Sequence, residues 1–148
     1  MAAMPQPEGY HTVTPYLVVK DAERLIEFLV AAFGAQETER LAAPNHRIAH
    51  AELRIGDSVV MLGEARDGHK ERPCMLYVYV SDADATWQRA VASGATAGQQ
   101  PQDQFYGDRS GSVTDPCGNE WWIATRIENV PPEELHRRIA ALMQQAEG

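Results

Sequence analysis

Residues 76–84, Leu-Tyr-Val-Tyr-Val-Ser-Asp-Ala-Asp, repeat the pattern of residues 15–23, Pro-Tyr-Leu-Val-Val-Lys-Asp-Ala-Glu. In each copy an apolar run typical of a strand leads to an aspartate that can cap the first turn of a helix. These aspartates, Asp21 and Asp82, lie 61 positions apart. A repeat at this period predicts two copies of one small unit.

Each aspartate is followed by an apolar stripe with helical spacing and then by a glycine, which suits the left-handed residue that ends a helix. The glycines Gly34 and Gly94 lie 60 positions apart. The stripe residues are Leu25, Ile26, Leu29 and Phe33 in the first copy and Trp87 and Val91 in the second. We therefore expect one amphipathic helix in each copy.

Alternating and β-branched runs predict the strands. The expected strands are 10–20, 36–41, 48–55, 58–62, 75–80, 96–100, 112–114 and 120–126, with 101–111 as a loop. A third helix is expected near Pro131, because proline and two carboxylates favour a helix start. The fold class is therefore α+β, with two βαβββ modules that form one cupped mixed sheet and a C-terminal helix.

This pattern also divides the chain. We expect a frayed tail over residues 1–9, a first module over 10–63, a linker over 64–73, a second module over 74–127 and a helical extension over 128–148.

Composition argues against some classes of function. The net charge of −8 argues against a general nucleic-acid binder, which needs a basic face. No run approaches the roughly 18 apolar residues of a membrane helix, and residues 1–9 lack the pattern of a leader peptide. Cys74 and Cys117 match no metal or redox spacing, so we expect reduced, structural thiols in a cytoplasmic protein.

Side chains alternate along a strand, so each expected strand has an aliphatic face and a second face. The aliphatic faces should lie under the helices, and Trp121 should lie with them or at a subunit contact. The second faces should line a cup. Their residues are Tyr16, His50, Glu52, Arg54, Met61, Tyr77, Tyr79 and Trp122.

The plan resembles the vicinal oxygen chelate superfamily, which includes glyoxalase I, extradiol dioxygenases and bleomycin-resistance proteins. Three segments carry the resemblance: Val19-Lys-Asp-Ala22, Ala32-Phe-Gly-Ala35, and the turn Asp115-Pro-Cys-Gly-Asn119 before an apolar strand. The chain looks most similar to the PhnB-like branch. The resemblance implies a small-molecule site in the cup and a homodimer.

Enzymes of this superfamily usually bind one divalent metal in the cup. The resemblance places the ligand positions at Thr14, Met61, Met75 and Trp122 of this sequence. None of these side chains suits a hard or borderline cation, which prefers carboxylate or imidazole. We therefore expect no metal and no cofactor.

The preferred interpretation is a binding protein for a small, partly aromatic or amphipathic molecule. The alternative is a metal-dependent lyase, isomerase or dioxygenase that uses His50 and Glu52 as atypical ligands, with Glu120 as a third candidate. A metal-free enzyme with His50 or Glu52 as base lies between the two. Arg109 can either clamp an anionic group of the ligand or pair locally with Asp108.

The predicted ligand-binding residues are Tyr16, His50, Glu52, Met61, Tyr77, Tyr79, Tyr106, Arg109 and Trp122. The predicted partners are a small molecule and a second copy of the chain, with no nucleic acid and no membrane.

Overall fold

A computed structural model describes residues 2–147. Met1, in the predicted tail, and Gly148, at the end of the predicted extension, lie outside the described residues. The elements are β1 (Tyr16–Val19), α1 (Ala22–Phe33), β2 (Gln36–Ala42), β3 (Ile48–Ile55), β4 (Ser58–Glu64), β5 (Met75–Tyr79), α2 (Ala83–Ala92), β6 (Thr96–Ala97), β7 (Gln102–Asp103), β8 (Asp108–Thr114), β9 (Glu120–Arg126) and α3 (Pro132–Glu147).

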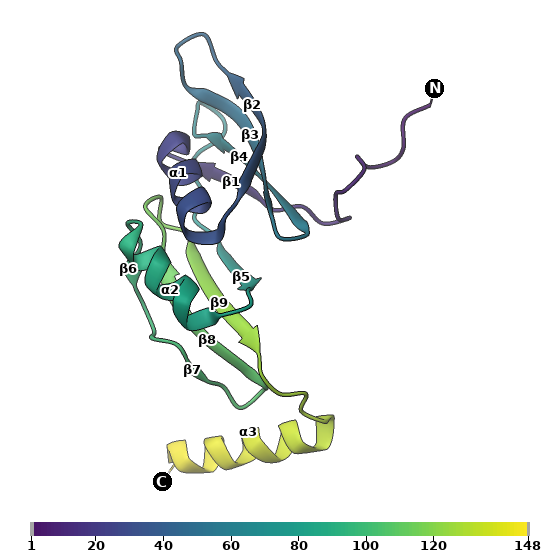
Figure 1. The fold of residues 1–148 in the computed structure, drawn as a ribbon, viewed down its shortest axis with the longest axis vertical. Helices are drawn as coiled ribbons and strands as arrows, with labels where there is room; N and C mark the ends of the chain where they lie inside the picture. Colours follow the sequence, from purple (N-terminus) through teal and green to yellow (C-terminus); the bar gives the residue numbers. More distant parts are fainter. Residues whose placement is uncertain (1, 148) are drawn as a thin grey trace.

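Hydrogen bonds divide the strands into two sheets. The first has the order β1-β4-β3-β2, and the second has the order β5-β9-β8-β6, with β7 also paired to β8. β1 runs parallel to β4 and β5 runs parallel to β9, so the second sheet repeats the plan of the first. The two halves lie end to end with α1 and α2 on the same side (Figure 1). The α+β class, the two βαβββ modules and the C-terminal helix are confirmed. The strands form two mixed sheets and not the one sheet that was predicted, because within residues 2–147 no strand of the first module pairs with a strand of the second.

The two aspartates cap their helices as predicted. The Asp21 carboxylate accepts from the Arg24 amide at 3.1 Å, and the Asp82 carboxylate accepts from the Ala85 amide at 3.1 Å. These bonds satisfy amide groups that have no partner inside the helix. Gly34 follows α1 with a φ of 67°, in the left-handed region that glycine enters at little cost.

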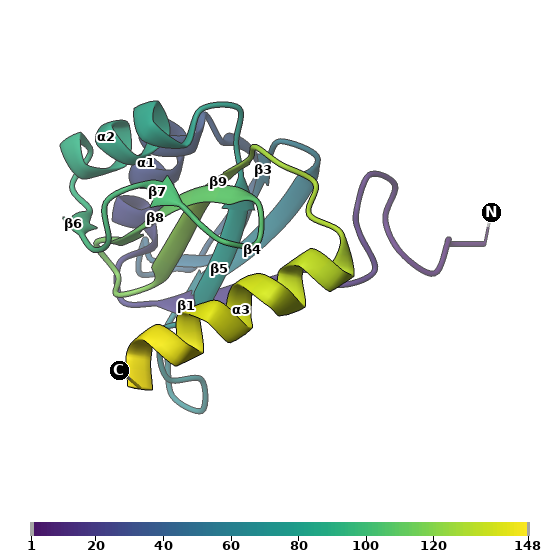
Figure 2. The ribbon, with the colours of Figure 1, turned by 90° about the horizontal axis from the view of Figure 1, so that it is seen from below.

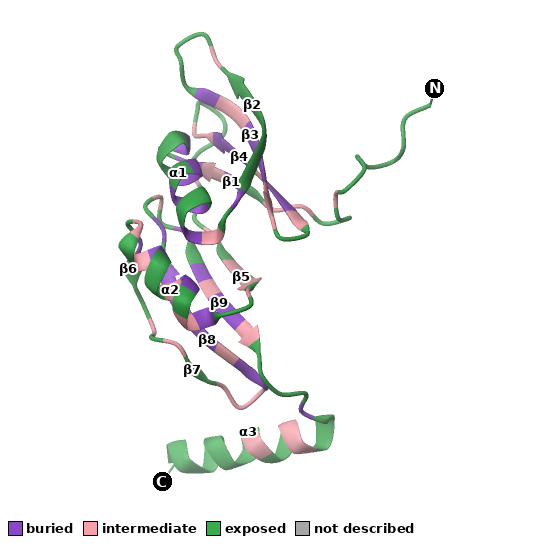
Figure 3. Ribbon diagram, in the orientation of Figure 1, coloured by how far each residue is buried: buried purple, intermediate pink, exposed green. Residues whose placement is uncertain are grey.

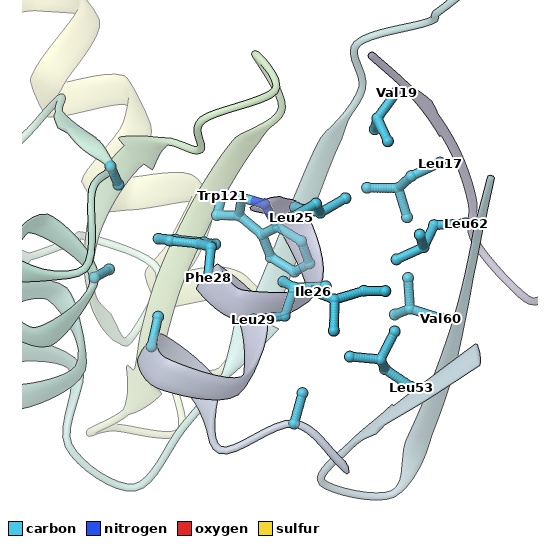
Figure 4. Packing of buried hydrophobic residues seen from close by; sticks show 14 of the residues in the cluster. Leu17, Val19, Leu25, Ile26, Phe28, Leu29, Leu53, Val60, Leu62 and Trp121 are labelled. Atoms are coloured by element: carbon cyan, nitrogen blue, oxygen red, sulfur yellow. The ribbon is translucent and has the colours of Figure 1, made fainter. Parts of the chain in front are cut away.

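The core lies between the helices and the aliphatic faces of the sheets. Figure 4 shows Leu25 and Leu29 of α1 on one side, with the side chains of the first sheet facing them. Trp121 of β9 enters the same core, where its ring centroid lies 5.0 Å from that of Phe33. Its side chain is 2% exposed, which confirms that Trp121 packs under a helix. Burial of each large side chain stabilises the fold by about 1.5–3 kcal/mol.

Several predicted strand bounds differ from the structure; β6, for example, ends at Ala97 and not at Gln100. Two differences are larger. The first strand begins at Tyr16, not Tyr10, because β1 has only β4 as a neighbour and pairs with it from Tyr16 onward. Residue Thr14 instead donates its hydroxyl to the His11 carbonyl. The segment 101–111 is not a loop throughout: it contains β7, and β8 begins at Asp108.

The third helix stands apart from the core. α3 passes the end of the second module that is farther from the first, on the side away from α2 (Figures 1 and 2). It has no buried residue, and Figure 3 shows it largely exposed. Arg138 fixes it by donating to the Phe105 carbonyl and by pairing with Glu128, both at 2.9 Å. Within residues 2–147, no helix has both the length and the apolar character needed to cross a bilayer.

Candidate functional site

The site candidates lie on the open faces of the two sheets, meaning the faces turned away from α1 and α2. Eight of the nine predicted residues belong to these faces or to the loop beside them. The structure separates them into two clusters. The first-sheet cluster is Tyr16, His50, Glu52 and Met61, and the second-sheet cluster is Tyr77, Tyr79, Tyr106 and Trp122.

A chain of hydrogen bonds joins three residues of the first-sheet cluster. The Tyr16 hydroxyl lies 3.2 Å from His50 Nδ1, and His50 Nε2 lies 2.7 Å from Glu52 Oε2. β3 places His50 and Glu52 two residues apart on one face, and β1 brings Tyr16 beside them. Met61 lies opposite Glu52 in the β3–β4 register.

The partners assign the histidine tautomer. An ionised carboxylate only accepts, so His50 Nε2 carries the proton that bonds Glu52. When the ring is neutral, its Nδ1 then has a free lone pair that can accept the proton of the Tyr16 hydroxyl. Glu52 is 7% exposed, so the carboxylate that orients the ring is itself fixed by burial.

The second-sheet cluster is built around Asp108, a carboxylate only 1% exposed. Tyr77 and Tyr79 donate their hydroxyls to Asp108 Oδ2 at 2.7 and 2.9 Å. Arg126 Nη1 donates to Asp108 Oδ1 at 3.1 Å. The Tyr106 hydroxyl lies 3.2 Å from that of Tyr77. One buried charge therefore fixes two tyrosine rings on the open face.

These contacts shift several pKa values. Burial alone would raise the pKa of Asp108, but the hydrogen bonds from Tyr77, Tyr79 and Arg126 together lower it. Burial and the hydrogen bonds with Tyr106 and Asp108 raise the pKa of Tyr77. The bond to Asp108, followed by burial, raises the pKa of Tyr79. The carboxylate stays charged and the phenols stay protonated at neutral pH.

The tyrosines and Trp122 form one aromatic wall, defined here as Tyr77, Tyr79 and Trp122. Tyr77 and Trp122 are direct partners in the β5–β9 register, and the Tyr77 and Tyr79 ring centroids lie 5.3 Å apart. Tyr77 is 41% exposed and Tyr79 is 62% exposed. Trp122 donates its indole proton to Glu120 at 2.9 Å. Every polar hydrogen of the wall is thus donated to a carboxylate of the chain.

One further polar atom belongs to this face. Ser110 lies on β8 two residues after Asp108, so both side chains leave the same side of the strand. The Ser110 hydroxyl is fully buried, and it has no hydrogen-bond partner within residues 2–147.

Arg109 lies away from the other eight predicted residues. It follows Asp108 on β8 and therefore leaves the opposite face, where its guanidinium bonds Asp84 of α2 at 2.7 and 3.0 Å. A third bond, of 3.0 Å, joins it to Asp103. Of the two interpretations of Arg109, the local pair with Asp108 does not form, because Asp108 pairs with Arg126.

The donor set does not fit the divalent metal that the superfamily often carries. Within residues 2–147, no three histidine, cysteine, aspartate or glutamate side chains lie together in a way that could hold an ion. His50 Nε2 and Glu52 Oε2 bond one another instead of facing a common third point. A retained ion generally needs three or four such ligands.

Two cavities lie beside these clusters. One of about 290 Å³ is lined by Tyr16, Gly63, Arg66 and His69, next to the first-sheet cluster. The other, of about 430 Å³, lies between the modules and has mainly apolar walls that include Phe33.

Sequence reasoning missed Asp108 as the centre of the second cluster. The signal was the alternation of Asp108, Ser110 and Ser112, which places three small or polar side chains on one face of a strand. Treating 101–111 as a loop concealed that signal, and one of the two interpretations of Arg109 made it the partner of the aspartate.

Comparisons with known proteins agree with the observed fold. The model of the Glyoxalase/Bleomycin resistance protein/Dioxygenase superfamily matches residues 10–123. Two uncharacterized proteins, from Mycobacterium bovis and Mycobacterium tuberculosis, are each 36% identical over 147 residues. The match covers 92% of this chain and 95% and 85% of theirs.

Solved structures share the architecture. TioX from Micromonospora sp. ML1 superposes with a TM-score of 0.66 at 29% identity, over 79% of this chain and 99% of TioX. A glyoxalase-related enzyme from Fulvimarina pelagi gives a TM-score of 0.64 at 19% identity, over 78% of this chain and 88% of that one, and shows the shared fold alone.

Proposed function

We propose that this chain, which belongs to the Glyoxalase/Bleomycin resistance protein/Dioxygenase superfamily, binds a small, flat, partly aromatic molecule on its aromatic wall. The observation that carries the proposal is the attachment of two exposed tyrosines, Tyr77 and Tyr79, to the single buried carboxylate of Asp108.

That attachment pre-organises the wall. A free tyrosine side chain on a surface rotates, and a ligand that stacks on it must oppose that motion. Here the hydroxyl bonds to Asp108 hold both rings before a ligand arrives. Ring stacking contributes about 0.5–1.5 kcal/mol per pair beyond the area buried. A fixed wall keeps more of that free energy for binding.

The polarity of the wall indicates which ligands suit it. Tyr77, Tyr79 and Trp122 donate their polar hydrogens to carboxylates, so they offer a ligand only ring faces and oxygen lone pairs. A ligand group that also only accepts would find no donor there. We therefore expect a flat molecule that carries its own hydrogen-bond donors or a positive charge, which electron-rich rings attract.

We also propose a homodimer. The two clusters lie on different sheets, and three of their tyrosines remain exposed in the single chain: Tyr16 at 49%, Tyr77 at 41% and Tyr79 at 62%. Large exposed apolar groups gathered on one face mark binding or interaction sites. A second copy placed over these faces would close a cup around a ligand. Sedimentation velocity should give a dimer at micromolar concentrations, and a monomer over the whole range would contradict this part of the proposal.

Calorimetric titration with 1-naphthylmethylammonium tests the binding function. The wild-type protein should bind it, and Tyr77→Leu and Tyr79→Leu should each weaken binding by about 2- to 12-fold, the ratio that corresponds to one lost stacking pair. Arg89→Gln is the matched control, because Arg89 belongs to α2 and bonds the Ala32 carbonyl of α1, on the helix side of the sheets and away from the aromatic wall. Equal affinity in the tyrosine variants and the wild type would overturn the proposal.

Membership of the PhnB-like branch and a location in the cytoplasm remain part of this proposal. Reduced Cys74 and Cys117 accord with that location, since both thiols are free in the structure.

A further inference from the structure

The first-sheet cluster has its own cavity, separate from the aromatic wall. A space of about 290 Å³ is lined by Tyr16, Arg66 and His69, among other residues. Gly63 also lines it. A Cβ added at Gly63 would lie 2.9 Å from the Tyr16 hydroxyl and 2.6 Å from the Ala49 carbonyl oxygen. Glycine at this position therefore leaves room for the phenol.

We propose that Tyr16, His50 and Glu52 form a proton relay in which the Tyr16 phenol is a nucleophile. The order of the three groups matches that of a hydroxyl, an imidazole base and a buried carboxylate in acyl-transfer enzymes. Each link lies within or close to hydrogen-bond reach, at 3.2 Å and 2.7 Å. The relay uses only residues of this chain and needs no metal.

The roles follow from the tautomer. Glu52 is the positioning residue, because its carboxylate accepts the hydrogen bond from His50 Nε2–H. The lone pair of His50 Nδ1 then faces the Tyr16 hydroxyl. It also stabilises the imidazolium that forms when Nδ1 takes the phenol proton. His50 is the base, and Tyr16 Oη is the atom that forms the new bond.

The step balances without an external oxidant or reductant. Tyr16 Oη attacks the carbonyl carbon of an activated ester, and its proton moves to His50 Nδ1. The bond between that carbon and the leaving oxygen breaks, and the leaving group departs with the electron pair. The proton on His50 then passes to the leaving group or to water. The product is a Tyr16 ester.

The cavity indicates the class of electrophile. Arg66 lines it, and no ion pair within residues 2–147 involves its guanidinium. Glu64 also lines it, but its carboxylate is paired with Arg47. A small acyl donor with an anionic group, such as a carboxylate, can therefore pair with Arg66 while its carbonyl meets Tyr16.

Acetyl labelling tests the relay. The full-length protein is treated with 2-nitrophenyl acetate, and acetylated tyrosines are identified and timed by peptide mass spectrometry. Tyr16 should be acetylated faster than Tyr79, although Tyr79 is the more exposed at 62% against 49%. Tyr79 is an internal control, because its hydroxyl donates to a carboxylate and the bond raises its pKa.

Two variants separate the relay from simple exposure. His50→Gln should slow labelling of Tyr16 at least about tenfold, since a positioned base contributes 10²- to 10⁴-fold. Glu52→Gln should slow it less. In that variant, long-range proton–nitrogen NMR should also show that the His50 ring has lost its uniform Nε2–H tautomer, a signature that a merely structural role would leave unchanged.

A second ester tests whether the site prefers an acyl donor that carries an anionic group. The compound 4-acetoxy-3-nitrobenzoate differs from 2-nitrophenyl acetate by one carboxylate on the leaving group. It should label Tyr16 several-fold faster than the neutral ester, and Arg66→Gln should remove that advantage without slowing the neutral ester.

Three results would overturn the relay: Tyr16 labelled no faster than Tyr79, Tyr16 labelled at the wild-type rate in His50→Gln, or a wild-type His50 ring whose Nε2 carries no proton. If both esters react equally with the wild-type protein, the relay stands and the anionic preference fails. Failure of naphthylmethylammonium to bind the aromatic wall leaves each of these outcomes unaffected.

Discussion

The Tyr77 hydroxyl lies 2.7 Å from Asp108 Oδ2 and joins a ring that is 41% exposed to a carboxylate that is 1% exposed. The two residues are 31 positions apart and belong to strands that are not neighbours, because β9 lies between β5 and β8. The bond therefore crosses a strand of the sheet. It fixes the aromatic wall and satisfies a buried charge, so stability and the proposed binding function depend on one contact.

Removing that hydroxyl should destabilise the fold. Tyr77→Phe leaves Asp108 with one donor fewer, and a hydrogen bond to a charged group contributes about 1.5–3 kcal/mol. We expect the free energy of unfolding in urea to fall by about 1–2 kcal/mol, because water that reaches Asp108 beside the exposed ring can replace part of the lost hydrogen bond. Tyr10→Phe is the matched control, because the Tyr10 hydroxyl makes no hydrogen bond within residues 2–147. Equal losses in the two variants would show that Asp108 does not depend on Tyr77.

Asp108 should make stability depend on pH in the acid range. Its pKa is lowered in the folded state, so its contribution is complete above the unfolded value of about 3.9 and is lost as pH falls through the folded value. Asp108→Asn should therefore be less stable than the wild type at pH 7, and the difference should shrink at about pH 3. Urea unfolding at both values measures it. A difference that stays constant between the two would contradict the shift.

The tyrosines should show the opposite dependence at alkaline pH. The pKa values of Tyr77 and Tyr79 are raised, so their contribution is present below the unfolded value of about 10 and is lost as pH rises beyond it. Ultraviolet titration of phenolate should show two of the five tyrosines ionising late. Asp108→Asn should bring those two toward ordinary values, because the carboxylate that opposes their ionisation is gone. Five tyrosines that titrate together would count against the assignment.

The sequence predicted the repeated parts of the fold and missed what departs from the repeat. Asp21 and Asp82 cap their helices as expected, because capping depends on residues within one turn. Trp121 was placed under a helix correctly by strand alternation. The beginning of β8 was missed because its first residues, Asp108 and Arg109, have little strand propensity, and pairing with β9 decides their conformation.

The division of the site into two clusters could not be predicted from alternation alone. Alternation shows which face of a strand a side chain leaves, and it gives no distance between two sheets. Tyr16 and Tyr77 hold equivalent places in the repeat, yet one bonds His50 and the other bonds Asp108. Both partners lie on the equivalent strand of their sheet, β3 and β8, so the repeat predicts the strand but not which side chain on it accepts the hydrogen bond.

Arg109 should have no part in ligand binding. Its guanidinium bonds Asp84 and Asp103 on the face of β8 that α2 covers. Arg109→Gln should leave the calorimetric affinity for 1-naphthylmethylammonium unchanged, whereas Tyr79→Leu weakens it. A loss in Arg109→Gln as large as that in Tyr79→Leu would place the ligand on the opposite side of the sheet.

The charge of the ligand is a further test of the wall. 1-Naphthylmethylammonium and 1-naphthylacetate have similar rings and opposite charges. The wall offers no free donor hydrogen, so calorimetry should show tighter binding of the ammonium compound. Tighter binding of the carboxylate would mean that another group, such as Arg126, faces the ligand.

The indole NMR signals of the three tryptophans test the central claim most directly, because each indole has a different partner. Trp122 donates to Glu120 on the open face, Trp121 to buried Asp115 and Trp87 to the Ser112 carbonyl. On titration with 1-naphthylmethylammonium, the Trp122 signal, identified by its loss in Trp122→Phe, should shift and saturate while the Trp121 signal stays in place. A Trp122 signal that does not move, or a Trp121 signal that moves more, would contradict binding on the aromatic wall.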